Sequence, residues 1–462
     1  MNAQAVFLAM LPEHILLLGI VVLMVMEVAS SKPRGEFVLS VLVVAAAAAA
    51  AAALGFSGQS IAPFPGQFAV TPAGSLAKAA VLALSVPVIL VSREDFGSGS
   101  FYPLLLSSLY GVCLLVSGES FLTLFLGLEL MSIPVYVLVL LAFRRPESAE
   151  AALKYLVLSG TASASFLMGA SLLYGSTGSL GLTGFANALA SNALLARTAV
   201  VMVVVAFFLK AAIVPFHTWA PDAYEAASVP VTAYMATLVK AGVLIAAVRL
   251  FGTAPVSTAL AGLIFILPFA SIVWGNIAAI RQTSFRRMIA YSSIAHAGYL
   301  FIAFLGDGAG RFQAVVFYLL AYGAMNVLAF AALPGDRDDL ARDRLENLKG
   351  LFHRDPLAAL LIGMAMLSLA GIPPFPGFVG KFLIFKNLIA AGYTTWAVLG
   401  LVGSYLGIYF YLRVIQYLFM TPGESTVPAA GPSRGLAMGA GLLCLGASIL
   451  LAIFPGWFLG WL

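Results

Sequence analysis

The chain contains fourteen apolar runs, and their length constrains the fold more than any other feature. Each run is about as long as a helix needs to cross the hydrocarbon core of a bilayer. Hydrophobic residues make up 62% of the chain and charged residues only 9%, whereas soluble domains carry about 25% charged residues. The alternating segments of about ten residues that are typical of membrane β-barrels do not occur in the sequence. The sequence therefore predicts an all-α integral membrane protein with about fourteen transmembrane helices.

Two of the predicted spans, the seventh and the twelfth, contain prolines and are predicted to be broken. The segment Ala62 to Gly74 is rich in proline and glycine, and it is expected to form a loop or a short hairpin. The fourteen spans are placed near residues 13–30, 37–55, 76–92, 101–117, 120–142, 150–174, 197–219, 230–250, 258–280, 285–305, 312–333, 356–389, 395–420 and 435–458.

Basic residues gather in alternate loops, which predicts the orientation of the chain. Cytoplasmic loops carry an excess of lysine and arginine, so the basic loops are expected to face the cytoplasm. Both termini would then face the periplasm if the host membrane is a bacterial inner membrane. The net charge of +5 is expected to reflect this topology and not nucleic-acid binding. The odd-numbered loops carry Lys32, Arg34, Arg93, Arg144, Arg145, Arg281, Arg286, Arg287, Arg337, Arg342, Arg344, Lys349, Arg354, Arg413 and Arg434, and the even-numbered ones Lys78, Arg197, Arg249 and Arg311.

The stretch Phe207 to Pro230 combines a lysine with helix-breaking prolines inside an apolar run. Lys210 follows apolar residues, and Pro215 comes one helical turn later. A charge in hydrocarbon is costly, and a proline inside a helix removes a hydrogen bond. Both are tolerated where neighbouring protein or water satisfies the freed groups. The stretch therefore predicts a broken helix that lines a polar interior; the alternative is a lysine that reaches the headgroups from a helix end.

The two predicted breaks suggest an internal repeat. Glu129 lies 81 positions before Lys210, and His296 lies 85 positions before Lys381, which stands beside Pro373, Pro374 and Pro376. Five spans separate the broken helices, so the two units would enter the membrane in opposite senses, as in transporters with inverted repeats. The predicted segments are a three-helix segment (1–100), a first repeat (101–250), a second repeat (251–420) and a C-terminal helix (421–462).

Ionisable residues inside predicted spans form a candidate proton relay, because such residues are rare in membranes and mark ion pathways. Burial favours the neutral form of a lysine, whereas a nearby carboxylate favours the charged form. A Glu–Lys pair that can separate would therefore bind and release a proton, and Glu129 with Lys210 is the predicted pair. Lys154 lies near the start of its span and is alternatively a snorkelling residue; a histidine satisfied by backbone carbonyls is the alternative for His296. The predicted relay residues are Glu129, Lys154, Lys210, Lys240, His296 and Lys381.

No nucleotide-binding or redox motif accompanies these residues. The sequence lacks a phosphate-binding glycine loop, a CxxC motif and histidines at haem spacing. Cys113 and Cys444 lie in apolar runs and are expected to be core thiols, without a metal or disulfide pattern. The chain is therefore expected to hold no cofactor or metal, and energy for moving protons would come from a partner.

Several long motifs resemble one family of membrane proteins. LELMSIPVYVLV, ALKYLVLSGTASA, FFLKAAIVPFHTWAPDAYEAA, TLVKAGV, RQTSFRRMIAYSSIAHAGYL and GIPPFPGFVGKF are similar to the antiporter-like membrane subunits of bacterial NADH-quinone oxidoreductase (respiratory complex I), most closely the subunit N branch. The resemblance covers nearly the whole chain after about residue 100. It implies a bundle of fourteen helices, two inverted five-helix units and broken seventh and twelfth helices.

The resemblance also implies roles and partners. Glu129 and Lys210 would be the coupled pair, Lys240 the central lysine, Lys381 the outlet-side residue and Lys154 an additional lysine. Neighbouring membrane-arm subunits of the M and K types would be partners, and FMN, iron–sulfur clusters and quinone would lie in partner subunits. Quinone reduction there would drive proton movement. The alternatives are a subunit of a multisubunit sodium/proton antiporter or of a membrane-bound hydrogenase, or a passive scaffold.

Overall fold

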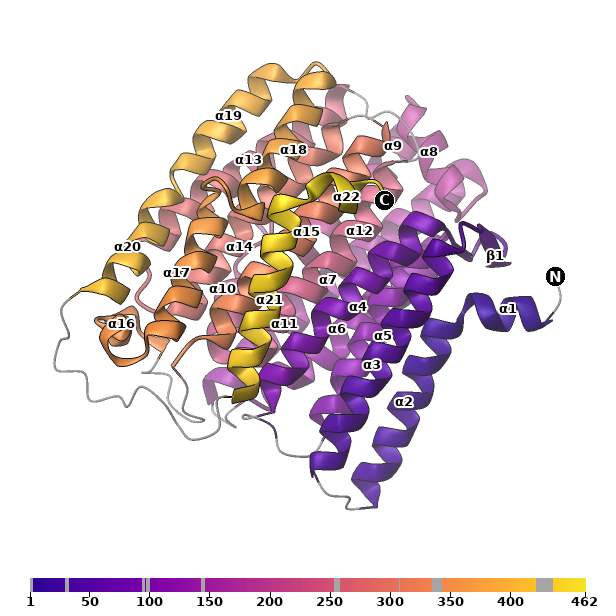
Figure 1. Cartoon of the computed structure of the whole chain (residues 1–462). Helices are drawn as coiled ribbons and strands as arrows, with labels where there is room; N and C mark the ends of the chain where they lie inside the picture. Colours follow the sequence, from indigo (N-terminus) through magenta and orange to yellow (C-terminus); the bar gives the residue numbers. More distant parts are fainter. Residues whose placement is uncertain are drawn as a thin grey trace.

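A computed structural model describes residues 3–29, 33–93, 96, 100–142, 146–252, 258–306, 308–334, 343–420 and 435–462 (Figure 1). Nearly all of its regular structure is helical. The α-helices are α1 (Ala3–Ala9), α2 (Leu11–Val28), α3 (Pro33–Phe56), α4 (Pro72–Ser92), α5 (Phe101–Ser117), α6 (Phe121–Leu140), α7 (Pro146–Thr177), α8 (Leu182–Ala190), α9 (Leu194–Ala211), α10 (Trp219–Ala226), α11 (Val229–Tyr234), α12 (Lys240–Phe251), α13 (Thr258–Ile280), α14 (Phe285–Ile302), α15 (Gly308–Ala331), α16 (Leu351–Arg354), α17 (Pro356–Ala370), α18 (Pro376–Ala390), α19 (Thr394–Tyr405), α20 (Ile408–Phe419), α21 (Gly435–Ile453) and α22 (Pro455–Leu459).

The helical lengths confirm the prediction of an all-α, multi-pass membrane protein. In the described ranges, 12 helical stretches are long and apolar enough to cross a membrane. Two shorter apolar helices, α5 and α17, stand where the fourth and twelfth spans are predicted. Large apolar side chains on the outer helices, such as Leu18, Leu153 and Leu443, are exposed, as expected for surfaces that face lipid.

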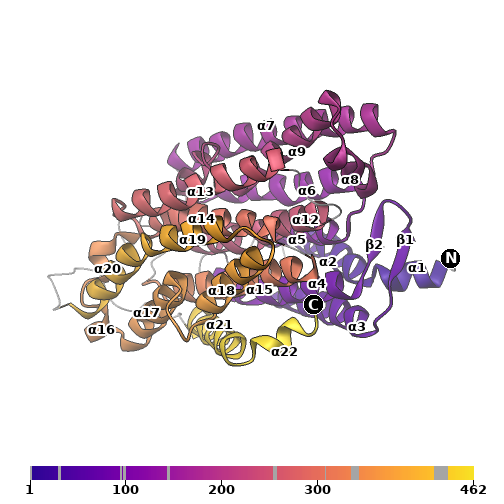
Figure 2. The same cartoon turned by 90° about the horizontal axis from the view of Figure 1, so that it is seen from above.

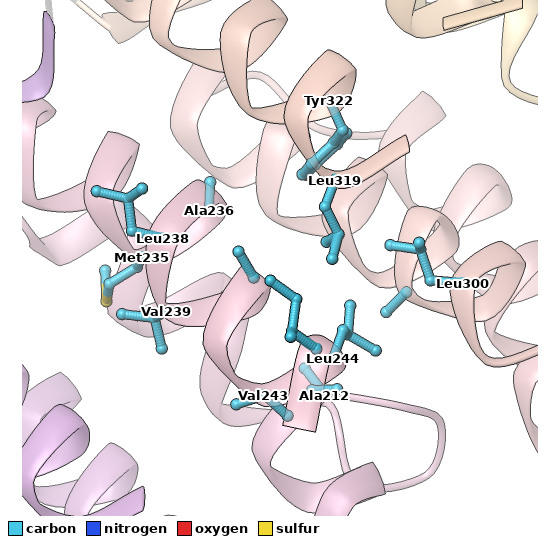
Figure 3. Close-up of a cluster of buried hydrophobic side chains, with 14 of the residues drawn as sticks. Ala212, Met235, Ala236, Leu238, Val239, Val243, Leu244, Leu300, Leu319 and Tyr322 are labelled. Atoms are coloured by element: carbon cyan, nitrogen blue, oxygen red, sulfur yellow. The ribbon is translucent and has the colours of Figure 1, made fainter. Parts of the chain in front are cut away.

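Three spans at the centre of the bundle are enclosed by protein. The most apolar windows of Val229–Phe251 and Gly310–Ala331 are completely buried, and that of Phe285–Leu305 is 94% buried. Seen from above, α12, α14 and α15 lie between α7 and α9 on one side and α21 and α22 on the other (Figure 2). Figure 3 shows apolar side chains of these central helices, including Leu244, Leu300 and Leu319, packed near Ala212. Any side chain on these enclosed helices is therefore shielded from lipid.

Two helices are interrupted at the predicted prolines. The first interruption separates α9 from α10, between Ala211 and Trp219, and the second separates α17 from α18, between Ala370 and Pro376. Each first half ends at a left-handed residue, Ala212 with φ of 61° and Gly371 with φ of 83°. Both interruptions also contain a cis peptide bond before proline.

The predicted loop at Ala62 to Gly74 contains a short hairpin. Strands β1 (Ile61–Phe64) and β2 (Phe68–Val70) pair antiparallel, with Ile61 opposite Val70 and Phe64 opposite Phe68. Gly66 in the turn has a φ of 72°, a left-handed conformation that glycine adopts without steric cost. The hairpin lies at the same edge of the bundle as α1 (Figure 1).

The four predicted segments share one body. One continuous apolar core contains residues from all of them, from Leu16 to Cys444. The division into inverted repeats stays a prediction. Part of the predicted basic loops, namely Lys32, Arg144, Arg145, Arg337, Arg342 and Arg434, lies outside the described residues.

Candidate functional site

The last turn of α9 places Lys210 among polar side chains of α6 and α7. Its side chain is only 3% exposed, and its Nζ lies 3.3 Å from Glu129 Oε1. The ammonium also donates hydrogen bonds to Ser132 Oγ at 3.1 Å and to Ser159 Oγ at 2.7 Å. The structure thus brings together the predicted pair, and two serines keep the ammonium hydrogen-bonded.

The partners of Lys210 follow helical spacing. Glu129, Ser132 and Tyr136 are three and four residues apart on α6, which places them on one face. On α7, Ser159 accepts a hydrogen bond of 2.5 Å from Tyr136, and Ser163 donates one to Glu129. Glu129 is 23% exposed, so the carboxylate is less enclosed than the lysine that it binds. A carboxylate at the edge of the buried site can change its distance to Lys210 at lower cost than one locked inside.

Lys240 begins α12 directly after a turn of π-helix, Met235–Val239. Such turns interrupt the regular helical hydrogen bonds and occur frequently at functional sites. Lys240 Nζ donates to the Ser293 carbonyl at 2.6 Å and also to the Ser293 hydroxyl. The Ser293 hydroxyl lies 3.3 Å from the Tyr224 hydroxyl. Within the described ranges, Lys240 has no carboxylate in ion-pair distance, and its ammonium depends on the serine.

His296 lies in the middle of α14 and uses both ring nitrogens. Nδ1 is 2.7 Å from the Tyr318 hydroxyl, and Nε2 is 3.0 Å from the Tyr411 hydroxyl. A neutral imidazole donates through one nitrogen and accepts through the other, so one tyrosine accepts while the other donates. The Tyr411 hydroxyl shares a further hydrogen bond of 2.5 Å with Ser292. These contacts form a hydrogen-bonded chain that could pass a proton across the imidazole.

Two tyrosine rings join His296 to the lysines on either side. The Tyr322 ring centroid is 4.6 Å from the His296 ring and 6.0 Å from Lys240 Nζ. The Tyr299 ring centroid is 5.7 Å from the His296 ring and 5.1 Å from Lys381 Nζ. We call Lys240, Tyr322, His296, Tyr299 and Lys381 the central row. Every member of the row is buried.

Lys381 lies in the second turn of α18 and faces the end of α17. Its Nζ donates to the carbonyls of Ala370 at 3.1 Å and Leu369 at 3.4 Å, and to Ser404 Oγ at 2.9 Å. The last carbonyls of a helix have no partner within that helix and carry its partial negative charge. The interruption after α17 therefore provides the acceptors that hold the Lys381 ammonium.

Lys154 is not part of this interior. Its side chain is 45% exposed, and it binds Glu150 at 2.7 Å and Asp222 at 2.8 Å. The structure therefore favours an exposed, paired lysine over a buried relay residue, because α7 presents this position on its outer face.

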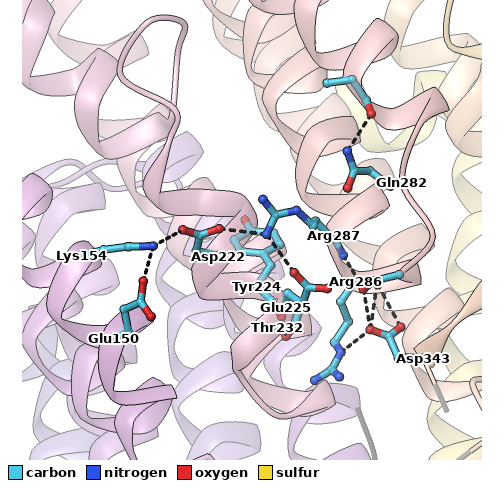
Figure 4. A network of polar contacts seen from close by, with 12 residues as sticks. Glu150, Lys154, Asp222, Tyr224, Glu225, Thr232, Gln282, Arg286, Arg287 and Asp343 are labelled. Atoms are coloured by element: carbon cyan, nitrogen blue, oxygen red, sulfur yellow. Dashed lines mark hydrogen bonds and ion pairs between the residues drawn. The ribbon is translucent and has the colours of Figure 1, made fainter. Parts of the chain in front are cut away.

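Lys154 belongs to a charged cluster at one end of α10 (Figure 4). Arg287 Nη1 lies 2.9 Å from Asp222 Oδ1 and 2.8 Å from Glu225 Oε2. Desolvation acts to raise the pKa of the Asp222 carboxyl, but hydrogen bonds from Lys154 and Arg287 outweigh it and hold that pKa below its usual value. The cluster lines a cavity of about 350 Å³. It joins α7, α10 and α14, and thus connects the first interrupted helix to the helix that carries His296.

Several residues of the site were not among the predicted relay residues. Ser159 and Ser293 bind the lysines, and Tyr318 and Tyr411 bind His296. Ser293 could have been noticed, since it precedes His296 by three residues and shares its helical face. No local signal points to Tyr411, which lies 115 residues from His296.

The described contacts form two groups. In the described part of the chain, no hydrogen bond joins the Lys210 group directly to the central row. Next to the Lys210 group, the Tyr136 ring contacts Tyr155 at 4.7 Å, and the Tyr155 ring stacks on Trp219 at 4.2 Å. Among the described residues, no three His, Cys, Asp or Glu side chains are arranged to hold a metal ion.

Comparisons with known proteins agree on one family. Residues 118–407 match the family described as NADH:quinone oxidoreductase/Mrp antiporter, transmembrane. The chain is 36% identical to NADH-quinone oxidoreductase subunit N of Pelobacter propionicus, over 97% of both proteins. It is also 36% identical to a chain in the structure of respiratory complex I from Thermus thermophilus, with a TM-score of 0.82 over 97% of this chain and 98% of that one.

A chain in the Mrp complex of a Dietzia species shares the fold, with a TM-score of 0.84 over 98% of this chain and 96% of that one, at 22% identity.

Proposed function

The chain belongs to the NADH:quinone oxidoreductase/Mrp antiporter membrane family, and from that premise we propose that it is the subunit N type of proton-translocating membrane subunit in an NADH-quinone oxidoreductase. The observation that carries the proposal is the central row, in which two buried lysines and a buried histidine are joined by tyrosine rings. Ionisable side chains in such a place mark ion pathways in membrane proteins.

In this proposal, Glu129 and Lys210 control when a proton is supplied to the central row. With the carboxylate at 3.3 Å, the ammonium form of Lys210 is favoured. Moving the carboxylate away leaves a buried cation without a counter-charge, so the lysine gives up its proton. Lys240, His296 and Lys381 then pass protons along the membrane interior, and Lys381 stands at the outlet.

The energy comes from quinone reduction in other subunits of the complex, which hold FMN, iron–sulfur clusters and quinone. Membrane-arm subunits of the M and K types are the neighbours. The protein lies in a bacterial inner membrane with both termini in the periplasm, as the distribution of basic residues predicts. A subunit of a multisubunit sodium/proton antiporter is the alternative, and it shares the fold.

The test is Lys240→Met, which removes the titratable group and keeps a side chain of similar length. We expect the complex to assemble and NADH-driven proton uptake into inverted membrane vesicles to fall severalfold. Lys386→Met is the matched control, because Lys386 lies on α18 and is exposed. The complex that carries this variant should translocate protons normally. Wild-type translocation by Lys240→Met would refute the relay and leave a scaffold, and sodium-dependent transport without quinone reduction would favour the antiporter.

A further inference from the structure

A second Glu–Lys pair lies in the N-terminal part of the chain, outside the predicted relay. Glu13 in the first turn of α2 binds Lys78 in the second turn of α4. The side chains are 0% and 3% exposed. The sequence assigns Lys78 to a loop on the non-cytoplasmic side, but the structure buries its side chain within the bundle.

Protein surrounds the pair on several sides. Lys78 Nζ lies 5.3 Å from the centroid of the Phe68 ring of β2. Helix α5 packs against both α2 and α4, which carry the pair. The second carboxylate oxygen, Glu13 Oε2, is buried without a hydrogen-bond partner in the described part of the chain. A buried ion pair with unsatisfied atoms is a costly way to hold two helices together, since well-packed apolar residues often serve as well or better.

The pair reproduces the chemistry of Glu129 and Lys210. Proton transfer breaks one N–H bond of Lys78 and forms an O–H bond on Glu13, while the electron pair of the broken bond stays on nitrogen. The two charges then vanish together, which removes the electrostatic cost of burial. Addition of one proton to the ion pair instead leaves only Lys78 charged, and loss of one proton leaves only Glu13 charged.

Helix α5 connects this pair to the helices of the relay. Ser108 on α5 accepts a hydrogen bond of 2.7 Å from the Tyr234 hydroxyl of α11. Tyr234 stands at the end of α11, and the π-helical turn that follows it leads directly to Lys240. Helix α5 itself packs against α2 and α4, which carry Glu13 and Lys78. Helix α4, which carries Lys78, also packs directly against α11 and against the π-helical turn before Lys240.

We infer that Glu13 and Lys78 form a second protonatable pair, which exchanges a proton during turnover at the end of the bundle where the β1–β2 hairpin lies. The inference rests on the proposed function, because it assigns the pair to the same proton movement. It extends the proton-handling part of the chain into the N-terminal three-helix segment, where the sequence offered no recognisable motif.

The experiment compares Lys78→Arg with the wild type in the assembled complex. Arginine keeps the positive charge and the ion pair but does not release its proton in proteins. A structural pair predicts normal proton translocation in this variant. A proton-exchanging pair predicts normal assembly and a severalfold fall in protons moved per NADH oxidised.

The double variant Glu13→Gln/Lys78→Met covers the case in which arginine does not fit. It removes both charges and leaves none unpaired. If the two residues only compensate each other's charge, the variant should assemble and translocate normally, whereas our inference predicts assembly with reduced translocation. Normal translocation in either assembled variant overturns the inference, and so does failure of both variants to assemble, which would assign the pair to the fold. Lys240→Met measured in parallel separates the two proposals: if it alone loses translocation, only the second pair is excluded, and if it translocates normally, the proposed function itself fails.

Discussion

The two interrupted helices carry their lysines on opposite sides of the break. Lys210 lies before the first interruption, in the last turn of α9, whereas Lys381 lies after the second, in the second turn of α18. In the sequence, Pro215 follows Lys210 whereas Pro373, Pro374 and Pro376 precede Lys381. The structure shows that they occupy different halves of their broken helices and meet different partners.

The partners differ in charge. Lys210 binds the Glu129 carboxylate and two serine hydroxyls, while Lys381 binds two helix-terminal carbonyls and one serine hydroxyl. A carboxylate brings a full negative charge and can move on its side chain. Carbonyls bring partial charges that are built into the end of α17. The first site is thus suited to switching proton affinity, and the second to holding a proton at a steadier affinity.

The same difference appears in the backbone. At the first break, the Leu209 carbonyl accepts a hydrogen bond of 3.0 Å from the Trp219 indole. At the second break, the lysine itself takes this role at Leu369 and Ala370. The donor at the first break, the Trp219 indole, is neutral, whereas the donor at the second break, Lys381, is titratable. Of these two sets of hydrogen bonds to helix-terminal carbonyls, only the second therefore depends on the protonation of a lysine.

The largest effect is expected from Glu129→Gln, which removes the charge that distinguishes the two sites. Removing one partner of a fully buried ion pair lowers the free energy of unfolding by about 3–5 kcal/mol. Because Glu129 is partly exposed, we expect a decrease of roughly 1–3 kcal/mol here. Proton translocation by the assembled complex should fall severalfold, measured as proton uptake at matched NADH oxidation. Glu129→Asp, which keeps the charge, should retain part of the activity. Normal translocation in Glu129→Gln together with a loss in Glu129→Asp would show that side-chain length, and not charge, is what Lys210 requires.

A smaller effect is expected from Lys381→Arg. The guanidinium keeps a cation against the Leu369 and Ala370 carbonyls but does not release a proton, so assembly should persist while translocation falls. If both residues serve one pathway, Lys381→Arg should add little to the fall that Glu129→Gln already causes, because the effects of coupled residues are not additive. A double-variant comparison of initial rates measures this. Lys386→Arg on the exposed face of α18 is the control. Unchanged translocation in Lys381→Arg would mean that Lys381 only caps the helix.

The smallest effect is expected from exchanging the left-handed residues. Gly371 has a φ of 83°, and a Cβ there would stand 3.0 Å from Lys381 Nζ; Gly371→Ala should therefore cost about 1–2 kcal/mol and displace the lysine. Ala212 already adopts a φ of 61°, so Ala212→Gly should be neutral or stabilising by up to about 1 kcal/mol. Thermal unfolding of the purified complex measures both. If Ala212→Gly lowered the stability as much as Gly371→Ala, the expected difference between the left-handed residues of the two breaks would be contradicted.

Part of the site could be predicted because it depends on local features. Charges inside apolar runs are visible in the sequence, and so are prolines that interrupt them. The pairing of Glu129 with Lys210 followed from the rule that a buried charge needs a partner, together with the small number of carboxylates within spans. The hairpin at Ile61–Val70 likewise followed from its turn residues.

The burial of other charged side chains could not be predicted, for an equally physical reason. Lys154 and Lys78 both lie near the start of a span, yet one is 45% exposed and the other 3%. Hydropathy is nearly the same for the two faces of these helices, so periodicity does not say which face meets protein. That choice depends on which helices pack alongside.

The sequence by itself determined that the chain spans a membrane many times, where two helices break and which titratable residues are held in apolar surroundings, because each of these follows from the chemistry of neighbouring residues. Other contacts between side chains that are distant in the sequence were decided only by the tertiary structure. His296 contacts Tyr411 across 115 residues, and Lys78 contacts Glu13 across 65. Contacts of this range depend on helix packing within one shared core, and packing is a property of all the helices together.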